Sequence, residues 1–173
     1  DDDDFARIEH DFGKQIRLRA QVGYFDHLFR FAQPVAATSR YASGAGEFVD
    51  QPNDRLDFDA QLRFPITDAW FLIVGAAANR NSLDRLTYAA SYWREFDSRT
   101  AITYEGRGAS RTTALFAQSE LLATGWLALY AGGRVDWWNT EGEVIQNTAP
   151  AFDQVYGRRT DRQFSPKLAA VAT

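Results

Sequence analysis

The chain has 173 residues, with 19 basic and 23 acidic side chains and a formal net charge of −4. Because the basic residues alternate with acidic ones and form no patch, nucleic-acid binding is not expected. The lack of cysteine excludes disulfides and thiolate chemistry, and the longest apolar run, the ten residues 69–78, is too short for a transmembrane helix.

The first predicted elements are two strands joined by a tight turn. Residues 5–12 alternate apolar and polar side chains, Gly13-Lys14 forms the turn, and a second strand covers residues 15–31. Within it, the ten residues from Gln15 to Tyr24 alternate without interruption. Soluble strands usually have about five or six residues, whereas a tilted strand needs about 9–11 to cross a bilayer.

The next predicted elements are a long loop, 33–53, and a strand, 55–64, that separates apolar from polar side chains. Its apolar face holds Leu56, Phe58, Ala60, Leu62 and Phe64, and its polar face holds Arg55, Asp57, Asp59, Gln61 and Arg63. A short turn from Pro65 to Asp68 leads into a returning strand, 69–79.

The second half of the chain predicts three more strands and two more long loops. The strands are 112–122, 126–138 and 162–172, the turn 123–125 joins the first two, and the loops are 80–111 and 139–161. Short turns therefore alternate with loops far above the usual length of about 4–6 residues. A meander with its long loops at one end is the layout of outer-membrane barrels, and the 14% aromatic content suits their interfacial girdles.

Three segments carry a resemblance to a known family. They are Thr113–Glu120 (Thr-Ala-Leu-Phe-Ala-Gln-Ser-Glu), Leu127–Trp137 with its Gly-Gly-Arg-Val-Asp, and Phe164–Leu168 (Phe-Ser-Pro-Lys-Leu). In this order they resemble barrel strands of TonB-dependent outer-membrane receptors. The resemblance implies an all-β, antiparallel up-and-down meander of about seven long strands, forming part of a 22-stranded type of transmembrane barrel.

The resemblance covers most of the 173 residues but about a third of such a barrel. The globular plug of the family and its TonB-binding box are not recognisable here. Seven strands alone would leave two open edges, which hydrocarbon does not tolerate, and the chain lacks methionine and a signal peptide. We therefore expect the sequence to be a segment of a longer polypeptide.

The polar faces of the strands are expected to line the barrel lumen, because an arginine that faces lipid at the midplane costs about 2–4 kcal/mol. These side chains either contact cargo or pair with one another and with the plug. The predicted lumen-facing residues are Arg17, Arg19, Asp57, Asp59, Arg63, Arg134 and Asp136.

Cationic and aromatic side chains of the predicted long loops are the candidates for ligand capture, because loops on a rigid scaffold often carry function. Arginine suits anionic groups, and aromatic rings stack on flat ones. Interfacial anchoring and packing within the loops are the alternative roles. The candidates are Arg40, Tyr41, Tyr88, Tyr92, Trp93, Tyr104 and Tyr156.

The resemblance implies a multi-pass protein of the cell outer membrane that imports a scarce ligand with energy from TonB. The cargo would be a ferric siderophore, cobalamin, haem or an oligosaccharide. The partners would be this ligand, such as a ferric chelate, the TonB complex acting through the plug, and outer-membrane lipid.

No catalytic motif stands out in the sequence. His10 and His27 are far apart, and Asp1–Asp4 lacks calcium-loop spacing. No enzymatic activity, metal site or cofactor is therefore predicted.

Two other classes of protein fit the alternating strands. A passive porin or small adhesive barrel would have no plug and would need no energy source. A soluble β-sandwich binding module also alternates apolar and polar residues along its strands.

Overall fold

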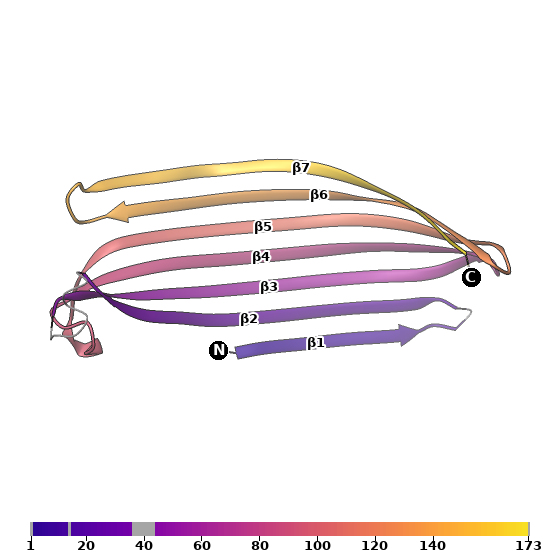
Figure 1. The fold of residues 1–173 in the computed structure, drawn as a ribbon. Coiled ribbons are helices and arrows are strands. Elements are labelled where there is room, and N and C mark those ends of the chain that lie inside the picture. The colour runs from indigo at the N-terminus through magenta and orange to yellow at the C-terminus, as the bar shows by residue number, and fades with distance from the viewer. Residues whose placement is uncertain (1, 14, 36–43, 173) are drawn as a thin grey trace.

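Seven antiparallel strands form a single curved sheet in the computed structural model of the chain (Figure 1). The structure describes residues 2–13, 15–35 and 44–172. Each strand pairs with its neighbours in sequence, which confirms the predicted all-β, up-and-down antiparallel meander. The strands are β1 (Asp2–Asp11), β2 (Arg17–Pro34), β3 (Gly46–Thr67), β4 (Trp70–Ala90), β5 (Arg99–Thr124), β6 (Leu127–Gln146) and β7 (Phe152–Ala172).

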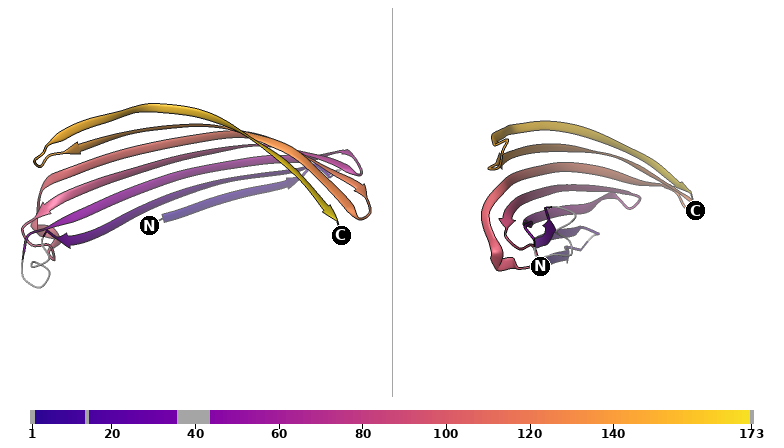
Figure 2. Two further views of the ribbon diagram at one scale, coloured as in Figure 1. Left: turned by 45° about the horizontal axis from the view of Figure 1, so that its top comes forward. Right: turned by 60° about the vertical axis from the view of Figure 1, so that its left-hand side comes forward.

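The sheet bends along its length and across its strands without closing on itself (Figure 2). Among the described residues, β1 and β7 are each paired along one side only, as expected for part of a barrel. A short 3-10 helix, η2 (Phe96–Ser98), lies between β4 and β5. No helix within the described ranges is long and apolar enough to span a membrane.

The strands are longer than the sequence pattern predicted. In place of the predicted loop 33–53, β2 ends at Pro34 and β3 begins at Gly46, and the predicted loops 80–111 and 139–161 shrink to connections at 91–98 and 147–151. The remaining residues of these loops continue β2 to β7 as paired strands at one end of the sheet. There the alternation of apolar and polar residues disappears while the backbone pairing persists, so periodicity alone did not detect these extensions.

The opposite end of the sheet carries tight turns. β3 continues through Pro65 to Thr67 with a register shift, so the turn comprises residues 68–69 and not the predicted 65–68. The next turn comprises residues 125–126, which places Trp126 in the turn and not in the predicted strand. At the first turn, Gly13 adopts a φ of 77°, a left-handed value that favours glycine.

Most of the buried side chains lie at the end of the sheet with the longer connections. Val49 is fully buried, and Phe48, Asp50, Thr87 and Ala90 are nearly so. The connection between β4 and β5 packs onto β3 there: the backbone N–H of Trp93 donates to the carbonyl of Gly44 at 3.1 Å. A Cβ at Gly46 would lie 2.2 Å from that of Trp93, so the connection approaches β3 closely.

Candidate functional site

The strand register separates the side chains into two faces, because directly paired residues of an antiparallel sheet point to the same side. Arg17 of β2 pairs with Arg63 of β3, and Arg19 pairs with Gln61. The pairing continues through β4 and β5 to β6, where Ala114 lies opposite Asp136. One face, here called the polar face, therefore carries all seven predicted lumen-facing residues: Arg17, Arg19, Asp57, Asp59, Arg63, Arg134 and Asp136.

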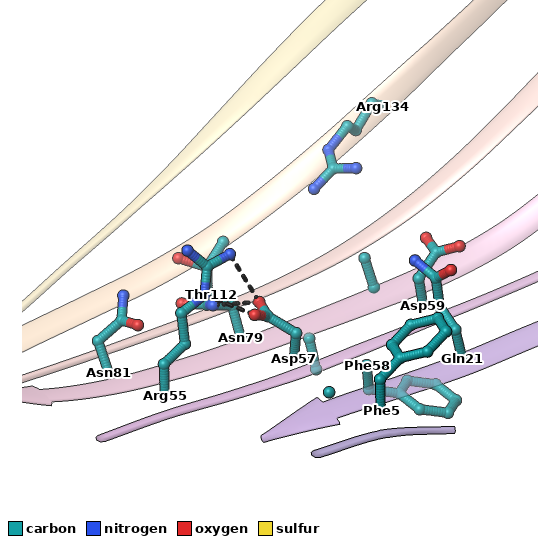
Figure 3. Close-up of a pocket in the computed structure, with 13 residues that line it drawn as sticks. Phe5, Gln21, Arg55, Asp57, Phe58, Asp59, Asn79, Asn81, Thr112 and Arg134 are labelled. Carbon is teal, nitrogen blue, oxygen red and sulfur yellow. Dashed lines mark hydrogen bonds and ion pairs between the residues drawn. The ribbon is translucent and has the colours of Figure 1, made fainter. Parts of the chain in front are cut away.

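The polar face is the concave side of the sheet. Gln21 of β2 and Arg134 of β6 line the same hollow, of about 590 Å³, although three strands lie between them. In Figure 3, Arg134 lies on the same side of the sheet as Gln21, Asp57 and Asp59. The curvature thus turns side chains from distant parts of the sequence toward one another.

Most charges of the polar face are paired. Asp57 accepts hydrogen bonds from Arg55 and from Asn79, and Arg134 Nε donates to Asp136 Oδ1 at 2.9 Å (Figure 3 shows the first group). The longer ion pairs on this face are Arg17–Asp11, Arg19–Glu9 and Arg63–Glu120, each at 3.7 Å. The pairs are partly exposed, so each contributes about 0–1 kcal/mol to stability.

Asp59 differs from its neighbours on this face. Within the described part of the chain, its carboxylate takes part in no ion pair or side-chain hydrogen bond. The residues in register with Asp59 on the next two strands, Ala77 of β4 and Ala114 of β5, have small side chains. These leave space above the sheet, and Asp59 and Arg134 both line the 590 Å³ hollow and a second one of about 480 Å³. The arrangement presents one unpaired carboxylate and one guanidinium to a shared space.

The opposite, convex face is apolar in the central part of the sheet, and much of it is exposed. On β4 its apolar stretch runs from Trp70 to Ala78, nine residues, followed by Arg80. Several large side chains on this face leave between 39% and 83% of their surface exposed. They include Ile8, Val22, Phe58, Leu115, Leu129, Phe164 and Leu168. An exposed apolar surface of this extent marks a contact with a partner or a membrane.

The ligand-capture candidates are dispersed, and several lie outside the connections. Tyr88, Tyr104 and Tyr156 lie in β4, β5 and β7, which corrects their predicted location in loops. Tyr92 and Trp93 do lie in the connection between β4 and β5, whereas Arg40 and Tyr41 fall outside the described residues. These three tyrosines lie in strands because β4, β5 and β7 extend beyond the segments in which apolar and polar residues alternate.

Tyr104 lines a hollow of about 380 Å³ at the end with the longer connections, together with Arg85, Glu47 and Gln146. The guanidinium of Arg85 lies 5.5 Å from the centre of the Tyr104 ring, within cation–π range. Arg85 is exposed, and the pairing of Thr87 with Tyr104 places the hollow on the polar face. Arg85 was not predicted, because the sequence around it shows no alternation.

A second group that sequence reasoning missed holds the β4–β5 connection in place. Asp50 accepts from Arg30 Nε at 2.7 Å and lies 3.4 Å from Arg99 Nη1. The ring of Phe96 in η2 lies 3.5 Å from the Arg99 guanidinium and 4.4 Å from that of Arg30. Three strands and the connection meet at this cluster, whose members are separated by up to 69 positions and share no motif.

Comparison with known proteins identifies the relatives of this fold. The ferric yersiniabactin uptake receptor FyuA from Yersinia pestis is 12% identical with a TM-score of 0.56, and the match covers 90% of this chain and 22% of that one. The ferric-catecholate import receptor Fiu from E. coli K12, in its open form, is 17% identical with a TM-score of 0.60, covering 97% of this chain and 32% of that one. These likenesses show the fold.

The chain therefore spans about a fifth to a third of the length of these receptors. No curated protein sequence matches it. The family profile described as "TonB dependent receptor-like, beta-barrel" matches residues 1–172, nearly the whole sequence. The chain belongs to the TonB-dependent receptor β-barrel family.

Proposed function

We propose that the chain forms part of an outer-membrane receptor that imports a scarce ligand with energy supplied through TonB. The observation that carries the proposal is the strand register, which collects seven charged residues on the concave face and leaves the convex face apolar. Membership of the receptor family supports the same reading. The concave face then lines the lumen, and the convex face contacts lipid.

Energetics favour this orientation of the sheet. The nine-residue apolar stretch on β4 suits a tilted strand, which needs about 9–11 residues to cross the bilayer. The reverse orientation would place Arg17, Arg19 and Arg63 against lipid, at up to about 2–4 kcal/mol for each arginine near the midplane. Unpaired edges are not tolerated in hydrocarbon, so in the membrane further strands pair with β1 and β7 and close the barrel.

A ferric siderophore is the cargo that we propose first. The two similar structures are a ferric yersiniabactin uptake receptor and a ferric-catecholate import receptor. The hollow lined by Arg85 and Tyr104 lies at the end with the longer connections, where a ligand arriving from outside would enter. Guanidinium groups suit anionic chelates, and aromatic rings suit their flat rings. Cobalamin, haem and oligosaccharides are the competing cargoes.

Deeper in the lumen, Asp59 and Arg134 offer one acceptor and one donor group to a passing ligand or to a plug domain. The barrel performs no covalent chemistry in this proposal. Energy reaches it through a plug that contacts TonB on the periplasmic side.

Uptake of radiolabelled iron by the full-length receptor, produced in a Gram-negative host that lacks its other ferric-chelate receptors, tests the proposal. We expect uptake of at least one ferric chelate and its loss when TonB is deleted. Uptake that persists without TonB would identify a passive porin, and uptake of labelled cobalamin or haem in place of iron would replace the proposed cargo.

The entry site has its own test. Replacing Arg85 and Tyr104 by alanine is expected to weaken binding of the imported chelate by roughly tenfold or more, because one charged contact contributes about 1.5–3 kcal/mol. The control is Arg107→Ala, an exposed arginine of β5 that pairs with Glu105. If the double variant and the control bind the chelate with equal affinity, this hollow is not part of the proposed ligand path.

A further inference from the structure

Four arginines lie on the convex face immediately beyond its apolar stretch. Arg80 follows the apolar stretch of β4 and pairs directly with Arg111 of β5. Arg111 in turn lies opposite Asn139 of β6, and Asn139 lies opposite Thr160 of β7. Arg158 and Arg162 flank Thr160. The four arginines, here called the outer arginine cluster, therefore come from β4, β5 and β7. Neighbouring strands are about 4.8 Å apart, which places Arg80 and Thr160 within about 15 Å.

The cluster surrounds a groove of about 540 Å³. Arg111, Arg158 and Arg162 line it together with Trp137, Asn139 and Thr160. The groove therefore offers three guanidinium groups, an amide and the hydroxyls of Thr113 and Thr160 around one space. The indole ring of Trp137 borders the groove on the side of the apolar surface. Trp137 pairs with Arg162, and the neighbouring pair on this face, Val135 and Phe164, is apolar.

The guanidinium groups of the cluster are not paired with a carboxylate in the described ranges of the chain. All four residues are exposed, and among the residues that the structure describes none of the four side chains forms an ion pair or a hydrogen bond. Asp161 also borders the groove, but its carboxylate accepts from the backbone N–H of Arg162. Glu141, opposite Ala109 on the convex face, pairs with none of them. The two facing arginines, Arg80 and Arg111, repel each other unless an anion lies between them.

We propose that the outer arginine cluster binds the phosphate groups of a membrane lipid headgroup. Guanidinium groups bind phosphate through paired hydrogen bonds, and an indole at the polar boundary suits the level of the headgroups. The cluster directly continues the apolar surface, so one lipid can place its chains on the apolar face and its phosphates among the arginines. A soluble anion would make no use of that continuity. The inference rests on the proposed orientation of the barrel in the membrane.

The test compares lipid binding by the full-length, detergent-solubilised receptor and by its Arg111→Gln/Arg162→Gln variant. The probes are diphosphorylated lipid A, the same lipid after enzymatic dephosphorylation, and inorganic phosphate. We expect the variant to bind diphosphorylated lipid A at least tenfold more weakly, and the wild-type receptor to lose a similar factor with the dephosphorylated lipid. Inorganic phosphate at millimolar concentration should not displace the lipid.

Arg107→Gln is the matched control, since Arg107 is an exposed arginine of the same strand that already pairs with Glu105. Its affinity for lipid A should stay within twofold of wild type. An equal loss in this control, unchanged binding by the double variant, or displacement by inorganic phosphate would overturn the proposal. Arg80→Gln alone, with an expected loss of several-fold, provides the measurement if the double variant does not fold.

Uptake by the same proteins separates this inference from the proposed function. The double variant should assemble, shown by heat-modifiable migration on a gel, and should import the ferric chelate normally, because the cluster faces away from the lumen. If the wild-type receptor binds the lipid but does not import the chelate, only the cargo proposal is contradicted. A receptor that imports the chelate but binds phosphorylated and dephosphorylated lipid equally would contradict the lipid site alone.

Discussion

Gly75 shows how a single residue shapes the polar face. It lies between the β3 backbone and the ring of Phe116 of β5, with which it is paired. A Cβ at this position would lie 2.2 Å from Phe116 Cζ and 2.6 Å from the carbonyl oxygen of Ala60. The ring could rotate away, but the backbone oxygen belongs to a paired strand and cannot move without disturbing β3. Glycine is therefore required by close approach and not by its φ angle.

Gly75→Ala is expected to destabilise the assembled barrel by about 1–3 kcal/mol, the usual cost of overpacking. The temperature at which the receptor loses its heat-modifiable gel migration measures the effect. Gly23→Ala serves as control, because a Cβ there meets atoms only at 3.9 Å. Equal transition temperatures for the two variants would show that the sheet adjusts freely at Gly75.

Asp50 has a comparable role at the other end of the sheet. Its nearly buried carboxylate pairs with two guanidinium groups, which in turn contact the ring of Phe96. Asp50→Ala leaves both arginines without their acceptor, and we expect a loss of about 1–3 kcal/mol. Because the cluster holds the β4–β5 connection, limited proteolysis should cleave residues 91–98 faster. Asp54→Ala, on the same strand and without an ion pair to any described residue, should leave the cleavage rate unchanged.

At the level of the elements, adjacent residues on one strand have opposite environments. Gln21 pairs with Asp59 on the polar face, whereas its neighbour Val22 pairs with Phe58 on the apolar face and is 41% exposed. The sequence correctly predicted this alternation for the central part of each strand. It did not predict the extensions of these strands, because the residues beyond the central segments, some buried and some exposed, follow no period of two.

The same substitution at these two positions tests the orientation of β2. In the proposed orientation, Val22→Arg would place a charge against lipid at a cost of up to about 4 kcal/mol, so we expect the receptor to fail to assemble. Gln21→Arg places the charge beside Asp59 on the lumen side and should assemble normally. Outer-membrane fractionation together with heat-modifiable migration measures both variants. Assembly of Val22→Arg with failure of Gln21→Arg would reverse the two faces.

On the scale of the whole molecule, the sheet is incomplete by itself. In the part that the structure describes, β1 and β7 have one unpaired side each, and the convex face exposes large apolar side chains. Unpaired strand edges bind other chains, and apolar patches associate in water. We therefore expect the stability of the sheet to depend on further strands and on a membrane.

Residues 1–173 produced alone are expected to aggregate in detergent-free buffer and to show no heat-modifiable band after refolding in detergent. The full-length receptor under the same conditions should show the band. Sedimentation and gel migration measure the difference. A monomeric, soluble segment with cooperative unfolding would instead favour the β-sandwich alternative.

Local alternation was sufficient to predict the fold class and the two faces of the central strand segments, because successive side chains there lie alternately on the apolar and the polar face of the sheet. It also identified the seven charged residues that share the polar face. Only the tertiary structure decided which of these charges are paired, that Asp59 and Arg134 share a hollow, and that Arg85 meets Tyr104 at one end of the sheet. It also brought together the outer arginine cluster. These groupings depend on strand register and sheet curvature, which join residues far apart in sequence and leave no local pattern.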